Sequence, residues 1–326
     1  MSNTDLNSEL LFVTEKNEDK EIAQKVEKNS KNKIPGNYIE VKLSSLGKLS
    51  VPGILHVRNY NFEEALELSE LTSDNEKEII MNVLNQLIYE DIDASLLHEQ
   101  EALEILLNVF GRWWGSKVEG FKYHINEDLP ADEINNKENI SIAEIPIANI
   151  NTTEIAKEIK EPITITNEFG ENYQFILPRM QTSIVAKDFV NLKYLAEENK
   201  FSSLRKRIDK DEDYTIEEYK EYTDYLKMKG KEYFRIYQAQ LIKSVNGKDI
   251  ESLDEAISML KEIDLSTWGE YNSTIDTSFK FGVEPKVKFK CSVNGNTISR
   301  RFLFRPMVFL PSVESQNHTG YTVSFG

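Results

Sequence analysis

The chain has almost no cysteine, since Cys291 is the only one among its 326 residues. A single thiol excludes an intrachain disulfide framework and fits synthesis in a reducing compartment. One thiolate also cannot build a closed structural zinc site, which takes four nitrogen or sulfur ligands. The four histidines show no metal-ligand spacing, so we expect no bound metal: they are His56, His98, His124 and His318.

Long hydrophobic runs are missing as well. No apolar segment approaches the ~20 residues that span a bilayer, and the first residues lack the basic-then-apolar pattern of a secretory signal. The 14 glycines form neither a phosphate-binding loop nor a dinucleotide fingerprint. Ser44 and Ser45 stand outside any nucleophile-elbow pattern. We therefore expect no membrane association, no cofactor, no small-molecule substrate and no catalytic residue.

Positive charge is scarce, because 39 Lys and Arg face 55 Asp and Glu, for a net charge of −16. Proteins that bind free nucleic acid carry a basic patch, so we do not expect free nucleic acid as the main partner. Protein partners remain compatible with this net charge. Strong acidity also keeps an unassembled subunit in solution through mutual repulsion.

Residues 1–35 are dominated by polar and charged side chains, and we expect a disordered arm there. The arm contains one apolar island, Leu10, Leu11, Phe12 and Val13. The island has two interpretations: Leu11 and Phe12 dock on a partner, or the island is the start of a frayed helix. The second is favoured because chain termini commonly fray.

Residues 36–126 have the pattern of a small α+β domain. Alternating apolar positions predict strands over 38–43 and 54–58. Apolar positions at helical spacing predict helices over 62–71, 76–89 and 99–113, followed by a strand over 118–125. Residues 127–160 lack clear periodicity and are interpreted as a linker or insertion, with an edge strand over 140–147.

Residues 161–326 are predicted to form a helix-rich domain that closes with a β-hairpin. A first hairpin is expected from 163–166 and 173–177, and helices over 186–197, 216–244 and 253–263. The fold class predicted for the whole chain is therefore α+β.

The closing hairpin carries the most distinctive motif. Val287, Phe289 and Cys291 alternate toward a turn at Asn294 and Gly295. The turn has the outline of a Cys-x-x-Cys-Gly knuckle with Asn294 in place of the second cysteine. We expect the turn to persist without the metal.

Next along the chain, residues 300–306 form a basic and aromatic cluster. It is either an anchor for an acidic partner surface or a nucleic acid, or a strand with Arg outside and Phe inside. The strand is preferred, and Arg300 or Arg305 would then be available for contacts on its exposed face.

A tyrosine-rich segment follows an acidic loop in the second half of the chain. Six tyrosines interleave with Lys and Glu: Tyr214, Tyr219, Tyr222, Tyr225, Tyr233 and Tyr237. Tyrosine is enriched at protein interfaces, so we predict that Tyr222, Tyr225 and Tyr233 bind a partner. Packing of these tyrosines onto the chain's own domain is an equally weighted alternative. The loop 209–216 imitates half of a calcium loop, but Tyr214 and Lys220 occupy positions that need Gly and Glu. We expect instead that Thr215 caps the following helix.

Two blocks together resemble the T-even-type phage baseplate family. The first is the segment 41–47, VKLSSLG, followed by ILHVR at 54–58 and the helices after it; the second is the Cys291–Gly295 turn with the aromatic run 302–311. The resemblance covers residues 35–125 and 280–312 and departs from the family at Asn294. It implies a structural or assembly component of a contractile tail baseplate, near the hub, that contacts other baseplate subunits and is not an enzyme. Such a protein is made in the host cytoplasm and then resides in the virion tail.

Two other classes remain open from the sequence. One is a tail-assembly chaperone that leaves before the particle matures. The other is a metal-dependent hydrolase that uses the carboxylates at 209–213. Presence in mature particles distinguishes the structural subunit from the chaperone, and stoichiometric metal binding would revive the hydrolase.

Overall fold

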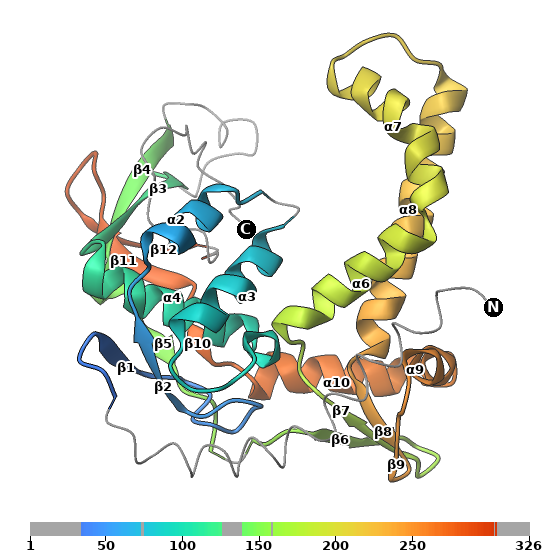
Figure 1. Cartoon of the computed structure of the whole chain (residues 1–326), viewed down its shortest axis with the longest axis horizontal. Coiled ribbons are helices and arrows are strands. Elements are labelled where there is room, and N and C mark those ends of the chain that lie inside the picture. Colours follow the sequence, from blue (N-terminus) through green and yellow to red (C-terminus); the bar gives the residue numbers. More distant parts are fainter. Residues whose placement is uncertain (1–33, 73–74, 126–138, 158, 303, 305–326) are drawn as a thin grey trace. The chain divides into compact units, whose positions relative to one another are not determined.

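The computed structural model describes residues 34–72, 75–125, 139–157, 159–302 and 304, and Figure 1 shows its helices and strands. The chain is α+β, as the sequence predicts. The described residues divide into two compact units. We call residues 161–274 the inserted domain, and residues 34–160 together with 275–304 the discontinuous domain.

The discontinuous domain begins with a hairpin of β1 (Tyr38–Lys42) and β2 (Ile54–Arg58). The strands are antiparallel, with Val41 opposite Leu55. Both side chains are fully buried, and so is Val57 on the same face. The predicted alternation of the two strands is confirmed, and it supplies one wall of the core.

Three helices supply further apolar residues to this core: α2 (Phe62–Ser69), α3 (Glu76–Leu87) and α4 (Glu99–Trp113). Asn61 caps α2, because its side chain accepts from the N–H of Glu64 at 3.0 Å and the Glu64 carboxylate accepts from the N–H of Asn61 at 2.7 Å. The apolar face predicted for α3 is buried through Ile79, Ile80, Val83, Leu84 and Leu87.

The rest of the discontinuous domain consists of three antiparallel strand pairs. They are β3 (Lys117–His124) with β4 (Ile140–Pro146), β5 (Thr152–Thr153) with β10 (Gly282–Val283), and β11 (Lys286–Lys290) with β12 (Thr297–Arg301). The predicted strand 140–147 is thus present as β4 within the stretch interpreted as a linker. The closing hairpin belongs to this domain and not to a domain 161–326, because Phe289 packs its ring against Tyr123 of β3 at 5.0 Å.

The inserted domain contains a four-stranded antiparallel sheet and several helices. The sheet has the order β6 (Ile163–Thr166), β7 (Asn172–Phe175), β8 (Ile242–Val245), β9 (Lys248–Asp249). The helices are α6 (Met180–Lys193), α7 (Leu195–Asp209), α8 (Ile216–Ala239) and α9 (Leu253–Leu260), and α10 (Leu265–Ser278) leads back into the discontinuous domain. Helices α6 and α8 lie side by side (Figure 1).

The predicted helix 216–244 is wrong at its end. Helix α8 stops at Ala239, and β8 follows because Ile242 and Ser244 point into the domain and pair with β7. The predicted helix 186–197 is also two helices, α6 and α7, which meet at Tyr194. None of the described helices is long and apolar enough to cross a bilayer.

Candidate protein interface

Helix α8 begins where the acidic loop ends. Thr215 accepts from the N–H of Glu218 at 3.1 Å, and the Glu218 carboxylate accepts from the N–H of Thr215 at 2.8 Å. Arg207 donates to the same carboxylate at 2.6 Å and to the carbonyl of Asp213 at 3.1 Å. This guanidinium lowers the pKa of Glu218. The predicted helix cap at Thr215 is confirmed, and Arg207 holds the loop in place.

Tyr225 is a core residue of the inserted domain. It is 2% exposed and packs its ring on Phe201 at 5.1 Å. Its hydroxyl donates to the Glu198 carboxylate, which also accepts from Lys229 Nζ at 2.7 Å. Burial, and then the hydrogen bond to Glu198, raises the pKa of Tyr225. For this residue the alternative of packing onto its own domain is correct.

Tyr222 and Tyr233 are half-buried, so each presents part of its ring to solvent. Tyr222 lies beside Phe201 with ring centroids 5.7 Å apart. Tyr233 stacks on Tyr237 one helical turn later, at 6.2 Å. These two predicted positions therefore combine packing with exposure.

A second apolar face runs along α8, separate from the face that packs in the domain. Successive helical residues are rotated by about 100°, so residues three or four apart share a face. We call this face the α8 stripe; it consists of Ile216, Tyr219, Thr223, Leu226, Gly230, Tyr233 and Phe234. Ile216 is 83% exposed, Phe234 58% and Leu226 44%. The tyrosine pattern alone does not indicate this face, although the helical spacing of Ile216, Leu226 and Phe234 is visible in the sequence.

Gly230 leaves a notch in the middle of the stripe. A Cβ atom placed on this glycine would meet nothing within 4 Å. Glycine inside a helix is about 1 kcal/mol less favourable than alanine, and no described side chain packs closely at this position to require it. The notch is therefore open space on the helix surface between Leu226 and Phe234.

Lysines line one edge of the stripe: Lys220, Lys227 and Lys231. Lys227 lies 3.6 Å from Asp224 in an exposed ion pair, and such pairs contribute little to the free energy of unfolding. Lys220 and Lys231 form no ion pair with a described residue. In a chain of net charge −16, this edge offers positive charge beside apolar surface.

Arg300 is used inside the discontinuous domain. Its guanidinium donates to three carbonyl oxygens, of His124 at 3.1 Å, Ile125 at 3.0 Å and Ser299 at 3.0 Å. It therefore ties β12 to the end of β3, and the prediction that it is available for a partner is not supported by this geometry. The other predicted partner-binding residues, Leu11, Phe12 and Arg305, lie outside the described residues.

The turn at Cys291 has the predicted knuckle shape. The N–H of Gly295 donates to the Cys291 carbonyl at 2.9 Å, and Gly295 has a φ of 71°, which favours glycine. The Tyr123 hydroxyl donates to Sγ at 3.3 Å and, with the N–H of Asn294, lowers the pKa of the thiol. Among the described residues no group of three or more His, Cys, Asp or Glu side chains could hold a metal ion.

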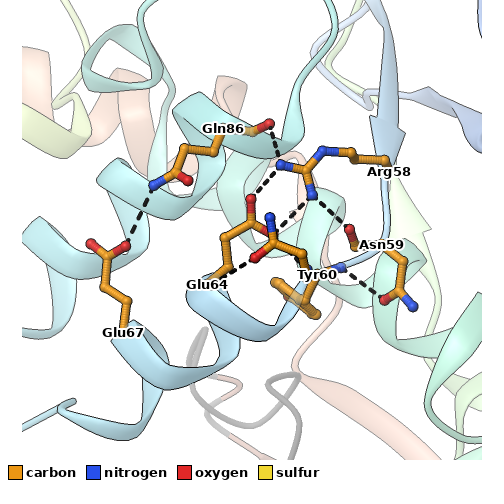
Figure 2. A network of polar contacts seen from close by, with 7 residues as sticks. Arg58, Asn59, Tyr60, Glu64, Glu67 and Gln86 are labelled. Atoms are coloured by element: carbon orange, nitrogen blue, oxygen red, sulfur yellow. Dashed lines mark hydrogen bonds and ion pairs between the residues drawn. The ribbon is translucent and has the colours of Figure 1, made fainter.

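A buried ion pair organises the helices next to the first hairpin (Figure 2). Arg58 donates to both carboxylate oxygens of Glu64, which is fully buried, and to the carbonyls of Asn59 and Gln86 at 2.9 and 3.0 Å. These contacts join β2, α2 and α3. The Tyr60 hydroxyl is buried nearby, and burial raises its pKa. No sequence motif indicated this network.

A second buried carboxyl lies under the loop after β1. The N–H of Ser44 donates to Glu104 Oε2 at 2.9 Å, and Glu104 is 1% exposed. Burial raises its pKa, opposed by the hydrogen bonds from Ser44. The Ser45 hydroxyl and Glu104 Oε1 have no hydrogen-bond partner among the described residues. Both serines are buried, so the loop is part of the core.

Comparisons with protein-family models, curated proteins and solved structures found no match to this chain. The geometry of the α8 stripe is thus the feature from which a function can be inferred.

Proposed function

We propose that this chain is a structural or assembly subunit of the baseplate of a contractile phage tail, near the hub, and that it acts through protein–protein contacts. The observation that carries the proposal is the α8 stripe. A helix with one face buried in its domain and a second apolar face in solvent has the pattern of a docking helix. No catalysis is needed for this role.

The resemblance to the T-even-type baseplate family supplies the identity of the assembly. The described parts of both resembling blocks, 35–125 and 280–312, belong to the discontinuous domain. The α8 stripe belongs to the inserted domain. The proposal thus assigns the family framework to one domain and the docking surface to the other. The protein would be made in the host cytoplasm and then reside in the tail.

The test is affinity purification of the tagged chain from infected cells, with mass spectrometry of the complexes and of mature particles. Recovery with baseplate subunits and in particles supports a structural subunit. Recovery only with free subunits makes the protein a chaperone, the second class left open by the sequence. The absence of tail proteins from both samples would overturn the proposal.

The contribution of the stripe is tested with matched variants. Leu226→Gln combined with Phe234→Gln removes two exposed apolar side chains, and we expect the recovered subunits to fall at least about tenfold. Met228→Gln is the control, because Met228 is 53% exposed on the same helix but lies about 160° around it from Leu226. Equal recovery with the double variant would show that the stripe is not the docking surface.

A further inference from the structure

The α8 stripe has an apolar row, a notch and a positive edge, and the chain itself contains a segment with the complementary properties. Residues 5–15, DLNSELLFVTE, carry the apolar island between Asp5, Glu9 and Glu15, with no Lys or Arg among them. The three carboxylates equal the three lysines of the stripe edge in number and carry the opposite charge. Charges of opposite sign around an apolar contact select the partner and its orientation.

We propose that residues 5–15 dock on the α8 stripe, with the apolar island on the apolar row and the acidic residues at the lysine edge. The inference rests on the proposed function in taking the stripe as a docking surface, and baseplate subunits would compete with residues 5–15 for it. Leu6, Leu10 and Val13 recur at i, i+4 and i+7, so a helix formed on docking would present them on one face. One of them, or Phe12, would fill the notch at Gly230.

The chain between the segment and the described residues has a reach that exceeds the length of α8. Residues 16–33 connect the segment to the start of the described chain at Ile34, and an extended chain of this length spans up to about 60 Å. Helix α8 has 24 residues and is about 36 Å long. A short flexible tether that spans its two sites gives an effective concentration on the order of millimolar, which would favour docking of the segment.

A second copy of α8 is a less suitable occupant. In an antiparallel pair of α8 stripes the lysine edges of both copies lie on the same side of the contact, and like charges in close contact are unfavourable. The acidic segment avoids this repulsion. The segment can come from the same molecule or from a neighbouring copy, and in the second case it links subunits.

The experiment is amide hydrogen exchange of the full chain, followed by mass spectrometry of peptides covering residues 5–15. We expect these residues to exchange at least about tenfold more slowly than an unstructured chain. Leu226→Gln with Phe234→Gln should restore the unstructured rate, and Met228→Gln should leave the protection in place. Exchange at the unstructured rate in the unmodified chain, or protection that survives the double variant, would overturn the inference.

Variants of the segment and its charges give an independent check. Leu10→Gln with Val13→Gln should abolish the protection of residues 5–15, whereas Ile22→Gln with Val26→Gln, an apolar pair outside the segment, should not. Lys220→Glu with Lys227→Glu should weaken the protection, and adding Glu9→Lys with Glu15→Lys should restore it. Failure of the charge reversal to restore protection would contradict the assigned orientation.

Two further readouts show which molecule supplies residues 5–15 and distinguish this inference from the proposed function. Protection that is independent of protein concentration places the segment on its own molecule, and protection that increases with concentration places it on a neighbouring copy; both support the inference. If residues 5–15 are unprotected but the stripe variant still loses baseplate subunits, this inference fails and the proposed function stands. If residues 5–15 are protected but no tail protein is recovered, this inference stands and the proposed function fails.

Discussion

Glu64 and Glu104 are both carboxyl groups with almost no exposure to solvent, but their surroundings differ. Glu64 faces the Arg58 guanidinium. Glu104 forms no ion pair with a described residue and receives the N–H of Ser44. An ionised carboxylate is stable in a core only when its charge is compensated. The two residues should therefore respond to substitution in different ways.

We predict that Glu104→Gln stabilises the discontinuous domain relative to the unmodified protein, and that this stabilisation increases as the pH rises. The pKa of Glu104 is raised above its ordinary value of 4.5 by burial, which outweighs the Ser44 hydrogen bonds. Between the unfolded and folded pKa values the folded state holds more protons, so the stability of the unmodified protein falls as pH rises through this window. Glutamine removes that loss. The difference in unfolding free energy between variant and parent should grow as the pH rises above the ordinary pKa of 4.5 and level off above the raised folded-state pKa.

Urea unfolding followed by tryptophan fluorescence measures this difference. Trp268 lies in the inserted domain, so a Trp268→Phe background leaves Trp113 and Trp114 to report on the discontinuous domain. A difference that stays constant from acid to neutral pH would contradict a raised pKa for Glu104.

The Arg58–Glu64 pair gives a second prediction at this scale. Arg58→Met leaves the Glu64 carboxylate buried without a counter-charge, and removing one partner of a buried pair costs about 3–5 kcal/mol. We expect a loss of ~3 kcal/mol in the unfolding free energy, because the Arg58 side chain is 20% exposed. Arg58→Met with Glu64→Leu should lose less than the sum of the single variants. Additivity of the two losses would show that the ion pair is not coupled.

Single residues of these sites could be found in the sequence, but their partners could not. Ser44 and Ser45 were visible as a loop next to Gly47, and nothing local connects them to Glu104, 60 residues away. Arg300 was visible as a basic residue on a strand. Its engagement with three carbonyls depends on the position of His124, which comes from the tertiary fold.

At the scale of elements, local patterns predict helices and strands where an apolar face is continuous. The boundaries of α4 follow from such a face, and Thr215 marks the start of α8. Helix α7 was missed because only Phe201 and Leu204 are buried along its 15 residues. Strand β8 was read as helix because its pairing with β7 comes from residues about 70 positions away.

The stripe allows a prediction in which stability and docking change in opposite directions. Gly230→Ala should stabilise α8 by about 0.5–1 kcal/mol, because alanine favours the helix and the added Cβ meets open space. The same methyl group fills the notch, so protection of residues 5–15 should decrease. Gly269→Ala in α10 is the matched control, since its added Cβ also meets nothing within 4 Å. It should change stability without changing the exchange of residues 5–15.

Thermal and urea unfolding of the inserted domain, reported by Trp268, measure the first effect of Gly230→Ala, and hydrogen exchange measures the second. Equal protection in both glycine variants would mean that the notch does not receive a side chain. A loss of stability in Gly230→Ala would mean that the space at this helix position is not open.

At the scale of the whole molecule, the chain leaves one domain and returns to it. The composition of residues 127–160 suggested a break in the chain near 160. Nothing in the sequence marks the return at 275, because α10 continues through it as one helix. The return is visible in tertiary contacts such as the pairing of β10 with β5 and the packing of Phe302 on Phe121 at 5.1 Å. These are long-range contacts that a local pattern does not encode.

This connectivity predicts different behaviour for fragments cut at the two boundaries. Residues 161–274 are contiguous and contain their own sheet, with Tyr271 donating to the carbonyl of Ile176 at 2.8 Å across the domain. We expect this fragment to unfold cooperatively by itself, as compact domains do. Residues 1–160 lack β10, β11 and β12, so β5 loses its partner strand and Tyr123 loses the ring of Phe289.

We therefore expect fragment 1–160 to lack a cooperative transition and to regain it when residues 275–326 are supplied, either as a peptide or through a short linker that replaces 161–274. Circular dichroism during thermal unfolding measures this, with the complete chain as control. Cooperative unfolding of 1–160 alone would show that the closing strands are dispensable for the discontinuous domain. Failure of 161–274 to fold would show that the inserted domain depends on its neighbour, since its own sheet and helices would then be insufficient to offset the loss of conformational entropy.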